Sequence, residues 1–315
     1  MPGACMTASE VFLQQLLNGL TVGSYLALVA LGYTMVYGII ELINFAHGDV
    51  YMMGFFISLS FLGALGATST LSGLTLIWVI AAVMPATMVC TGLINLAIDR
   101  IAYKPLRRAP RLAPLITAVG ASFVLTNIAQ NWKGPSQVLY PNIFPTINIL
   151  SELMDLKTQV LFTTKDIFLI GVTVPLMVGL HLFIRHSKLG KAMRATAQDR
   201  EAAAMMGINV ERIIMLTFFI GGALAGAAGM VFGIYLNTGR YLMGFEAGLK
   251  AFTAAVLGGI GNIPGAVLGG YLIGFLSAFS DQYLSAAWTR AAVFLILVLV
   301  LVFKPTGILG ERTLN

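Results

Sequence analysis

Charged residues are scarce in this chain, and their scarcity excludes an ordinary soluble domain. Asp, Glu, Lys and Arg together make up 10% of the 315 residues, against about 25% in soluble proteins. A helix at the surface of a soluble protein carries charge on its solvent-facing side, whereas long stretches here carry none. The uncharged stretches are 11–40, 50–98, 112–132, 167–184, 213–239 and 251–280.

Residues for redox, metal or nucleotide chemistry are also few. Cys5 and Cys90 are the only cysteines, which is too few for a disulfide framework. The three histidines, His47, His181 and His186, do not form a metal-binding spacing, and the chain has no G-x-x-x-x-G-K-[ST] phosphate loop. We therefore expect a transport subunit and not an enzyme, with no metal and no cofactor bound by the chain itself.

The apolar residues that are present predict an all-α, polytopic membrane protein. A helix crosses the bilayer in roughly 20 apolar residues, so the stretch 50–98 is long enough for two crossings. Barrel strands would alternate apolar and polar residues, but 213–228 and 291–303 are apolar on all sides. We expect a single transmembrane permease domain over 1–315 with about eight transmembrane helices.

Basic residues gather in two short segments, and the positive-inside rule places both in the cytoplasm. Five Lys and Arg residues lie between 100 and 111, and six lie between 185 and 212. The parity of the crossings then puts the N-terminus outside, makes 132–166 an external loop and makes 185–212 a cytoplasmic loop. Residues 1–10 lack the basic start and cleavage site of a secretory signal, so we expect the first apolar helix to be retained. The basic loops favour membrane lipid, not nucleic acid, as a partner.

Two segments interrupt the apolar stretches and are candidates for a transport path. Gly and Pro are dense at 258–265, so we expect 251–280 to form two short helices joined by an irregular turn, as a re-entrant segment or a tight hairpin. Irregular backbone is tolerated at membrane depth only beside protein or a water-filled cavity. The second interruption is 41–49. The predicted pathway residues are Asn44, Phe45, His47, Gly258, Gly261 and Asn262.

Each interruption also has a simpler interpretation. Segment 41–49 can be a solvated turn, with Glu41 and Asp49 among the lipid headgroups. The glycines can mark close packing between helices. The uncharged stretches contain no carboxylate or cation, which argues against an ion-coupled transporter with an intramembrane charge. Composition alone leaves a channel open.

The segment 185–212 predicts a cytoplasmic docking helix. Strong helix formers run from Lys191 to Met206, and Gly207 is placed to end the helix. Small side chains let another protein approach closely, and Met205 and Met206 offer adaptable apolar contacts. An amphipathic helix resting on anionic lipid is the alternative. The residues expected to couple to a partner are Asp199, Arg200, Glu201, Ala202, Ala203, Ala204 and Gly207.

Several segments resemble one transporter family. Glu201-Ala202-Ala203 followed by Gly207 resembles the EAA-type coupling loop of ABC importer permeases, although the later Ile and Leu-Pro positions of that loop are not clearly present. GYTMVYGIIELINFAHGDVYMMGF at 32–55, KAFTAAVLGGIGNIPGAVLGGYLIG at 250–274 and KPTGILG at 304–310 look like the characteristic segments of branched-chain amino-acid importer permeases. The chain is most similar to the H-type membrane subunit, and the resemblance covers nearly its whole length.

The resemblance implies a division of labour among several subunits. The chain would pair with a second, homologous permease as a heterodimer in the plasma (inner) membrane. Two cytoplasmic ATPase subunits would hold ATP and Mg, and an external substrate-binding protein would deliver branched-chain or other neutral amino acids. Permeases for urea and short-chain amides are similar, so those substrates are the alternative.

Overall fold

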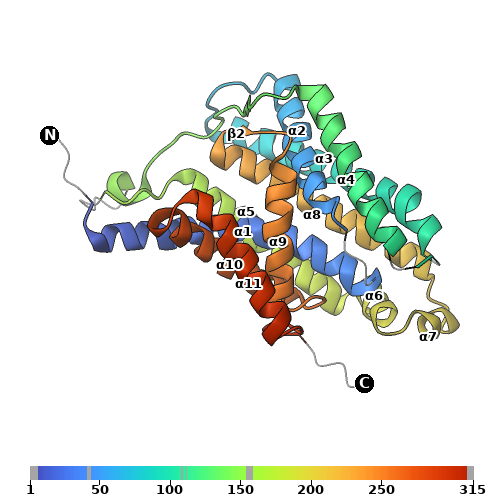
Figure 1. Ribbon diagram of the computed structural model, residues 1–315. Helices are drawn as coiled ribbons and strands as arrows, with labels where there is room; N and C mark the ends of the chain where they lie inside the picture. Colours follow the sequence, from blue (N-terminus) through green and yellow to red (C-terminus); the bar gives the residue numbers. More distant parts are fainter. Residues whose placement is uncertain (1–5, 41–43, 108, 111, 154–158, 311–315) are drawn as a thin grey trace.

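The computed structural model describes residues 6–40, 44–107, 109–110, 112–153 and 159–310, and it is almost entirely helical (Figure 1). The prediction of an all-α protein is confirmed. Two-residue strands β1 and β2 pair antiparallel, and short π-helical or 3₁₀ segments cover Asp99–Tyr103, Lys104–Leu106 and Ile149–Leu153. The helices and strands are α1 (Ala8–Ile40), α2 (His47–Ala64), α3 (Gly73–Ile98), α4 (Leu112–Lys133), β1 (Val138–Leu139), α5 (Thr164–His186), α6 (Lys188–Gln198), α7 (Arg200–Met205), α8 (Val210–Leu236), β2 (Thr238–Gly239), α9 (Met243–Gly258), α10 (Ile263–Tyr283) and α11 (Ala286–Phe303).

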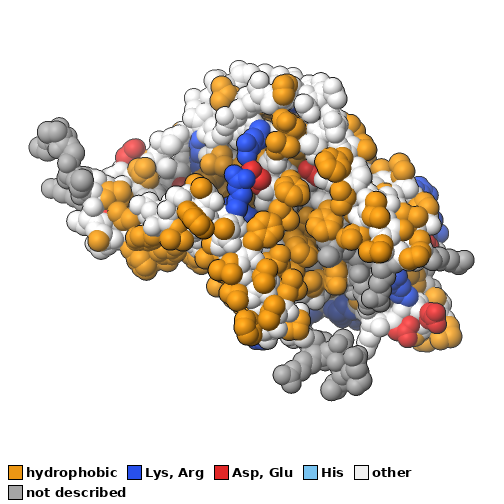
Figure 2. All heavy atoms as spheres, viewed as in Figure 1, with side chains coloured by type: hydrophobic (Ala, Val, Ile, Leu, Met, Phe, Trp, Pro, Cys, Tyr) orange, Lys and Arg blue, Asp and Glu red, His pale blue; other side chains and the backbone are white. Residues whose placement is uncertain are grey.

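Seven helical segments of the described chain are long and apolar enough to cross a membrane. Of these, α1 and α8 are largely buried inside the protein, whereas α3, α4, α5 and α11 expose most of their apolar side chains. Figure 2 shows such side chains covering much of the face that α9 and α11 form, with Lys, Arg, Asp and Glu confined to a small group. A helix that is apolar toward its surroundings is stable in lipid. The exposed helices therefore form the membrane-facing surface around a core of α1 and α8.

Glycines bring the core helices into close contact. A Cβ at Gly274 of α10 would lie 2.4 Å from the Cα of Gly23 in α1, and a Cβ at Gly54 of α2 would lie 2.6 Å from the Cα of Gly226 in α8. Small residues at crossings let helix backbones approach, which drives association where the solvent is itself apolar. At these crossings the backbones of the core helices thus pack directly against each other.

The two ends of α1 mark opposite ends of the protein. Gln14 exchanges two hydrogen bonds with the backbone of Leu161, at 3.0 Å and 2.7 Å, in the predicted external segment. At its other end the carbonyl of Ile39 accepts hydrogen bonds from Arg200, in the predicted cytoplasmic segment. A helix of 33 residues is about 50 Å long, and Figure 1 shows α1 running from the N-terminal side toward α6. The two predicted loops therefore lie at opposite ends, while which end faces the cytoplasm stays a prediction.

The predicted break within 251–280 is present as the turn between α9 and α10, but the prediction of two short helices is wrong for α10, whose 21 residues are long enough to cross a membrane. Gly259 and Gly261 both adopt positive φ, at 108° and 91°, a conformation that glycine allows without strain. The first helix begins at Met243, earlier than expected, and includes Glu246 and Lys250. Its 16 residues span about 24 Å, less than the roughly 30 Å thickness of a hydrocarbon core.

Candidate functional site: transport path and coupling segment

Asn44 lies in the connection between α1 and α2, buried in a chain of hydrogen bonds. Its Oδ1 accepts from the Tyr103 hydroxyl at 3.0 Å, and its Nδ2 donates to Oδ1 of Asn95 at 3.3 Å. Asn95 of α3 in turn donates to the carbonyl of Phe218 in α8 at 2.7 Å. Buried amides are stable only when they are bonded in this way. The connection is therefore fastened to α3 and α8.

His47 begins α2 and is fully buried. Its ring packs edge-on against Tyr33, with 4.7 Å between ring centroids. A Cβ at Gly32 would lie 2.3 Å from Nε2 of His47, so only glycine leaves room for the imidazole there. The interpretation of this segment as a solvated turn is therefore wrong for Asn44 and His47, while Glu41 lies outside the described residues.

Asp49, in the first turn of α2, is also buried, with 1% of its surface exposed. Its Oδ2 accepts from Ser122 Oγ at 2.5 Å, and its Oδ1 accepts from Thr126 Oγ1 at 3.3 Å, both on α4. The backbone of Gly244 in α9 closes the other side, because a Cβ there would lie 2.5 Å from Oδ1. The expectation of a headgroup position for Asp49 is wrong, and a carboxylate lies inside the helix bundle.

The second interruption is held together by its own backbone and by the C-terminal segment. Asn262 caps α10 by accepting from the Gly265 N–H at 3.0 Å, and it donates to the Leu309 carbonyl at 2.8 Å. The N–H groups of Ile308 and Leu309 bond to the last carbonyls of α9. A Cβ at Gly258 would lie 1.9 Å from the Gly265 carbonyl oxygen. Close packing thus accounts for Gly258, and a pathway role for this group stays a prediction.

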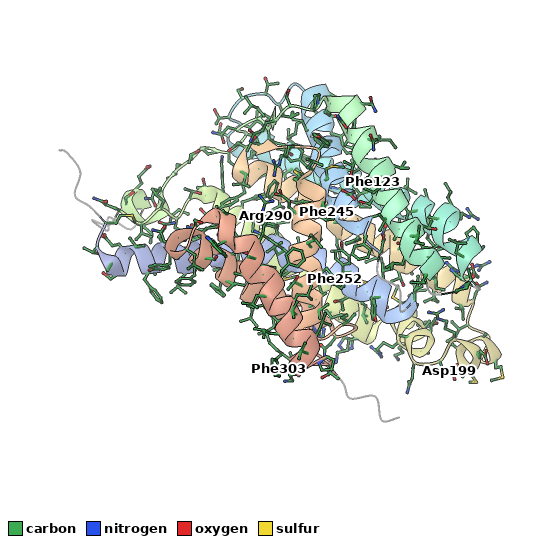
Figure 3. The ribbon with its side chains drawn as sticks, in the orientation of Figure 1. Phe123, Asp199, Phe245, Phe252, Arg290 and Phe303 are labelled. Carbon is green, nitrogen blue, oxygen red and sulfur yellow. The ribbon has the colours of Figure 1, made fainter. Side chains whose placement is uncertain are left out.

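Phe252 of α9, labelled in Figure 3, packs against aromatic residues of α1 and of the first interruption. Its ring centroid is 6.3 Å from that of Phe45 and 6.1 Å from that of Tyr33. A cavity of about 10 Å³ is lined by Phe252, Tyr33, Tyr37, Ala255 and Ile260. That space holds about one water, so the aromatic side chains close the space between the two predicted pathway groups.

The coupling segment forms two helices, α6 and α7, where one continuous helix is predicted from Lys191 to Met206. Asp199 interrupts it with extended backbone angles, φ −154° and ψ 114°. Its carboxylate accepts from the N–H groups of Glu201 and Ala202 at 2.8 and 3.0 Å. Asp favours such a cap over a position inside a helix. The predicted end of the helix is confirmed, because Gly207 follows α7 with φ +81°.

The exposed side of α7 is available to a partner. Glu201, Ala204, Met205, Met206 and Gly207 are exposed, and Figure 3 places Asp199 at the edge of the molecule. Ala203 is buried and Ala202 is half-buried. Arg200 differs from the others, because its guanidinium reaches the carbonyl of Ile39 in α1. Small and flexible apolar side chains at such a surface suit a protein contact.

Comparison with known proteins decides the family. Residues 15–302 match the family described as branched-chain amino acid transport system, permease component. The chain belongs to this family. It is 43% identical to the high-affinity branched-chain amino acid transport system permease protein LivH of Salmonella typhimurium over 301 residues, which cover 95% of this chain and 96% of LivH. It is 44% identical to the corresponding permease protein BraD of Pseudomonas aeruginosa over 303 residues, which cover 95% and 96% of the two chains. No solved structure matches significantly.

Membership of this permease family makes the chain a transport subunit and not an enzyme. With seven apolar spans among its described residues, it is a multi-pass protein of the inner membrane. Sequence reasoning missed Asp49 as a buried polar group of this permease, since the sequence places it beside other polar residues at the end of an apolar stretch. No sequence signal pairs it with Ser122 and Thr126, which lie 73 and 77 positions away.

Proposed function

We propose that this chain forms the membrane path for branched-chain amino acids in an ATP-driven importer. The observation that carries the proposal is the exposed docking surface of α7 in a branched-chain amino acid permease that has no phosphate-binding loop of its own. ATP hydrolysis then falls to two partner ATPase subunits that hold ATP and Mg. A second, homologous permease completes the path, and an external substrate-binding protein delivers the cargo.

The mechanism we propose is alternating access. Closure of the ATPase pair moves α6 and α7, and the attached membrane helices then open the path to one side at a time. A ligand shifts such an equilibrium only by binding the two states with different affinities. Nucleotide at the ATPase pair and the loaded binding protein outside provide that difference. Asn44, Phe45 and His47 in the first interruption, and Gly258, Gly261 and Asn262 in the second, are the proposed pathway positions.

Substitutions on the exposed side of α7 test the coupling. In the purified complex, we expect Glu201→Lys or Gly207→Trp to abolish ATP hydrolysis stimulated by the loaded binding protein, because each alters the surface offered to the ATPases. Insertion of the permease should be normal. Glu152→Lys is the matched control, since Glu152 is exposed in the predicted external loop. ATPase subunits that still co-purify and couple normally with both α7 variants would remove the proposed docking role.

Urea and short-chain amides are the alternative cargo. The high identity to LivH and BraD favours branched-chain amino acids. A competition experiment distinguishes the two classes of cargo. For a branched-chain amino acid importer, we expect an excess of unlabelled leucine to suppress uptake of labelled leucine, and an excess of urea or acetamide to leave that uptake unchanged.

A further inference from the structure

Arg200 begins α7, but its side chain points into the protein. Nε and Nη2 both donate to the carbonyl oxygen of Ile39, at 3.1 and 2.6 Å. Ile39 lies in the last described turn of α1. A guanidinium presents its donors in a rigid planar fork, so the two bonds fix the start of α7 relative to the end of α1.

A cavity beside Arg200 lies between the start of α7 and the end of α1. It has a volume of about 260 Å³ and is lined by Ile40 and Leu106 on one side and by Thr196 and Asp199 on the other. Side chains that face a cavity lose packing contacts across it. Within the described residues, the side-chain hydrogen bonds between α7 and α1 are those of Arg200.

The end of α1 leads to both interruptions. A Cβ at Gly38 would lie 3.3 Å from the Cα of Gly261, in the turn between α9 and α10. The chain also continues from α1 to Asn44, which is bonded to Asn95 and Tyr103. A displacement of the end of α1 therefore reaches the second predicted pathway segment through the Gly38–Gly261 contact.

A second arginine provides a comparison. Arg194 of α6 donates from Nη1 to the carbonyls of Ile184 and Arg185, at 2.6 and 3.1 Å, at the end of α5. The coupling segment is thus tied by one arginine to a peripheral helix and by another to the central helix α1. Of these two ties, the one to α1 leads to the interruptions, and α6 also packs directly against α1.

We propose that Arg200 transmits the movement of α7 to the end of α1 and so to the transport path. In this role, which rests on the importer function proposed above, Arg200 is a positioning residue and not a contact for the ATPase subunits. The exposed neighbours Glu201 and Ala204 make that contact. Without the guanidinium, α7 moves with the ATPases while α1 stays behind.

The ratio of amino acid transported to ATP hydrolysed tests this role in the complete complex. We expect Arg200→Gln to retain the ATPase subunits and their ATP hydrolysis but to lower the ratio about tenfold, the order of effect of losing a charge-assisted hydrogen bond. Arg200→Lys, which keeps a charged donor, should recover part of it. Arg194→Gln should leave the ratio unchanged. So should Arg212→Gln, whose side chain is exposed and makes no hydrogen bond among the described residues.

Two results would overturn the role of Arg200. One is an unchanged transport-to-ATP ratio in Arg200→Gln, and the other is loss of the ATPase subunits from that variant, which would make Arg200 a docking residue. Neither result bears on the importer function itself, which the Glu201 and Gly207 variants test.

Labelling provides a readout that a general loss of stability does not change. Single cysteines are placed at Tyr37, near the end of α1, or at Met205 on α7, with Cys5 and Cys90 replaced. We expect trapping the ATPases with ATP and vanadate to change the maleimide labelling rate at both positions when Arg200 is present. In Arg200→Gln the change should persist at position 205 and disappear at position 37. A change at position 37 that persists without Arg200 contradicts the proposed transmission.

Discussion

Asp49 places a carboxylate inside the helix bundle, and its partners are two hydroxyl groups on α4. A buried charge or polar group is costly when its hydrogen bonds are missing. Ser122 and Thr126 therefore serve the packing of α4 against α2 as well as satisfying the carboxylate. Asp99 is also fully buried, and one of its carboxylate oxygens, Oδ1, bonds Arg107 at 2.6 Å.

Removing the hydroxyl of Ser122 should destabilise the permease. We expect Ser122→Ala to lower the free energy of unfolding by about 1–3 kcal/mol, because it takes one hydrogen bond from a buried carboxylate. The thermal unfolding midpoint of the purified protein in detergent measures the effect. Thr117→Ala is the control on the same helix, since its hydroxyl bonds only to the Ala113 carbonyl of its own helix. Equal effects of the two substitutions would contradict the role given to Asp49.

The residues of the candidate site could be predicted by type but not by environment. The polar interruption containing Asn44, His47 and Asp49 is visible in the sequence as a break between apolar stretches. Whether those side chains meet water or protein depends on which helices pack there. Asn95 and Tyr103 from one distant segment and Ser122 from another complete their surroundings, and no local pattern indicates these pairings.

At the scale of elements, glycine contacts decide how the core helices pack. We expect Gly274→Ala to lower the yield and thermal stability of the folded permease, because the added Cβ would lie 2.4 Å from the Cα of Gly23 in α1. Gly171→Ala in α5 is the matched control, since nothing lies within 4 Å of its added Cβ. Alanine favours a helix over glycine by up to about 1 kcal/mol, so the control should be neutral or stabilising. Similar losses in both variants would contradict the packing described.

Element positions followed from the apolar stretches more reliably than element boundaries did. The stretch 213–239 anticipates α8, which covers Val210–Leu236, because a run of that length in lipid has no stable state other than a helix. Helix α9 begins at Met243, before the uncharged stretch 251–280 from which its start is predicted, because the helix also includes the charged residue Glu246. Glu246 is paired with Arg240 at 2.6 Å at the surface, so the helix tolerates it. The sequence does not predict the break at Asp199, because a single capping residue stands among strong helix formers on both sides.

At the scale of the whole molecule, the two ends of the bundle have different chemistry. Arg200 and the exposed side of α7 lie at one end of α1, while Gln14 and the segment around Leu161 lie at the other. The long central helix α1 joins these ends and packs closely against α10. A permease with this arrangement can pass a movement at one end to a path inside the bundle.

Leucine accumulation in proteoliposomes tests the central claim most directly. The vesicles hold this permease with its partner permease and ATPases, and ATP and the external binding protein are supplied on their respective sides. We expect accumulation of labelled leucine against its gradient that needs hydrolysable ATP and this chain, and that survives collapse of proton and sodium gradients. Accumulation that stops when the ion gradients collapse but continues without ATP would contradict the account.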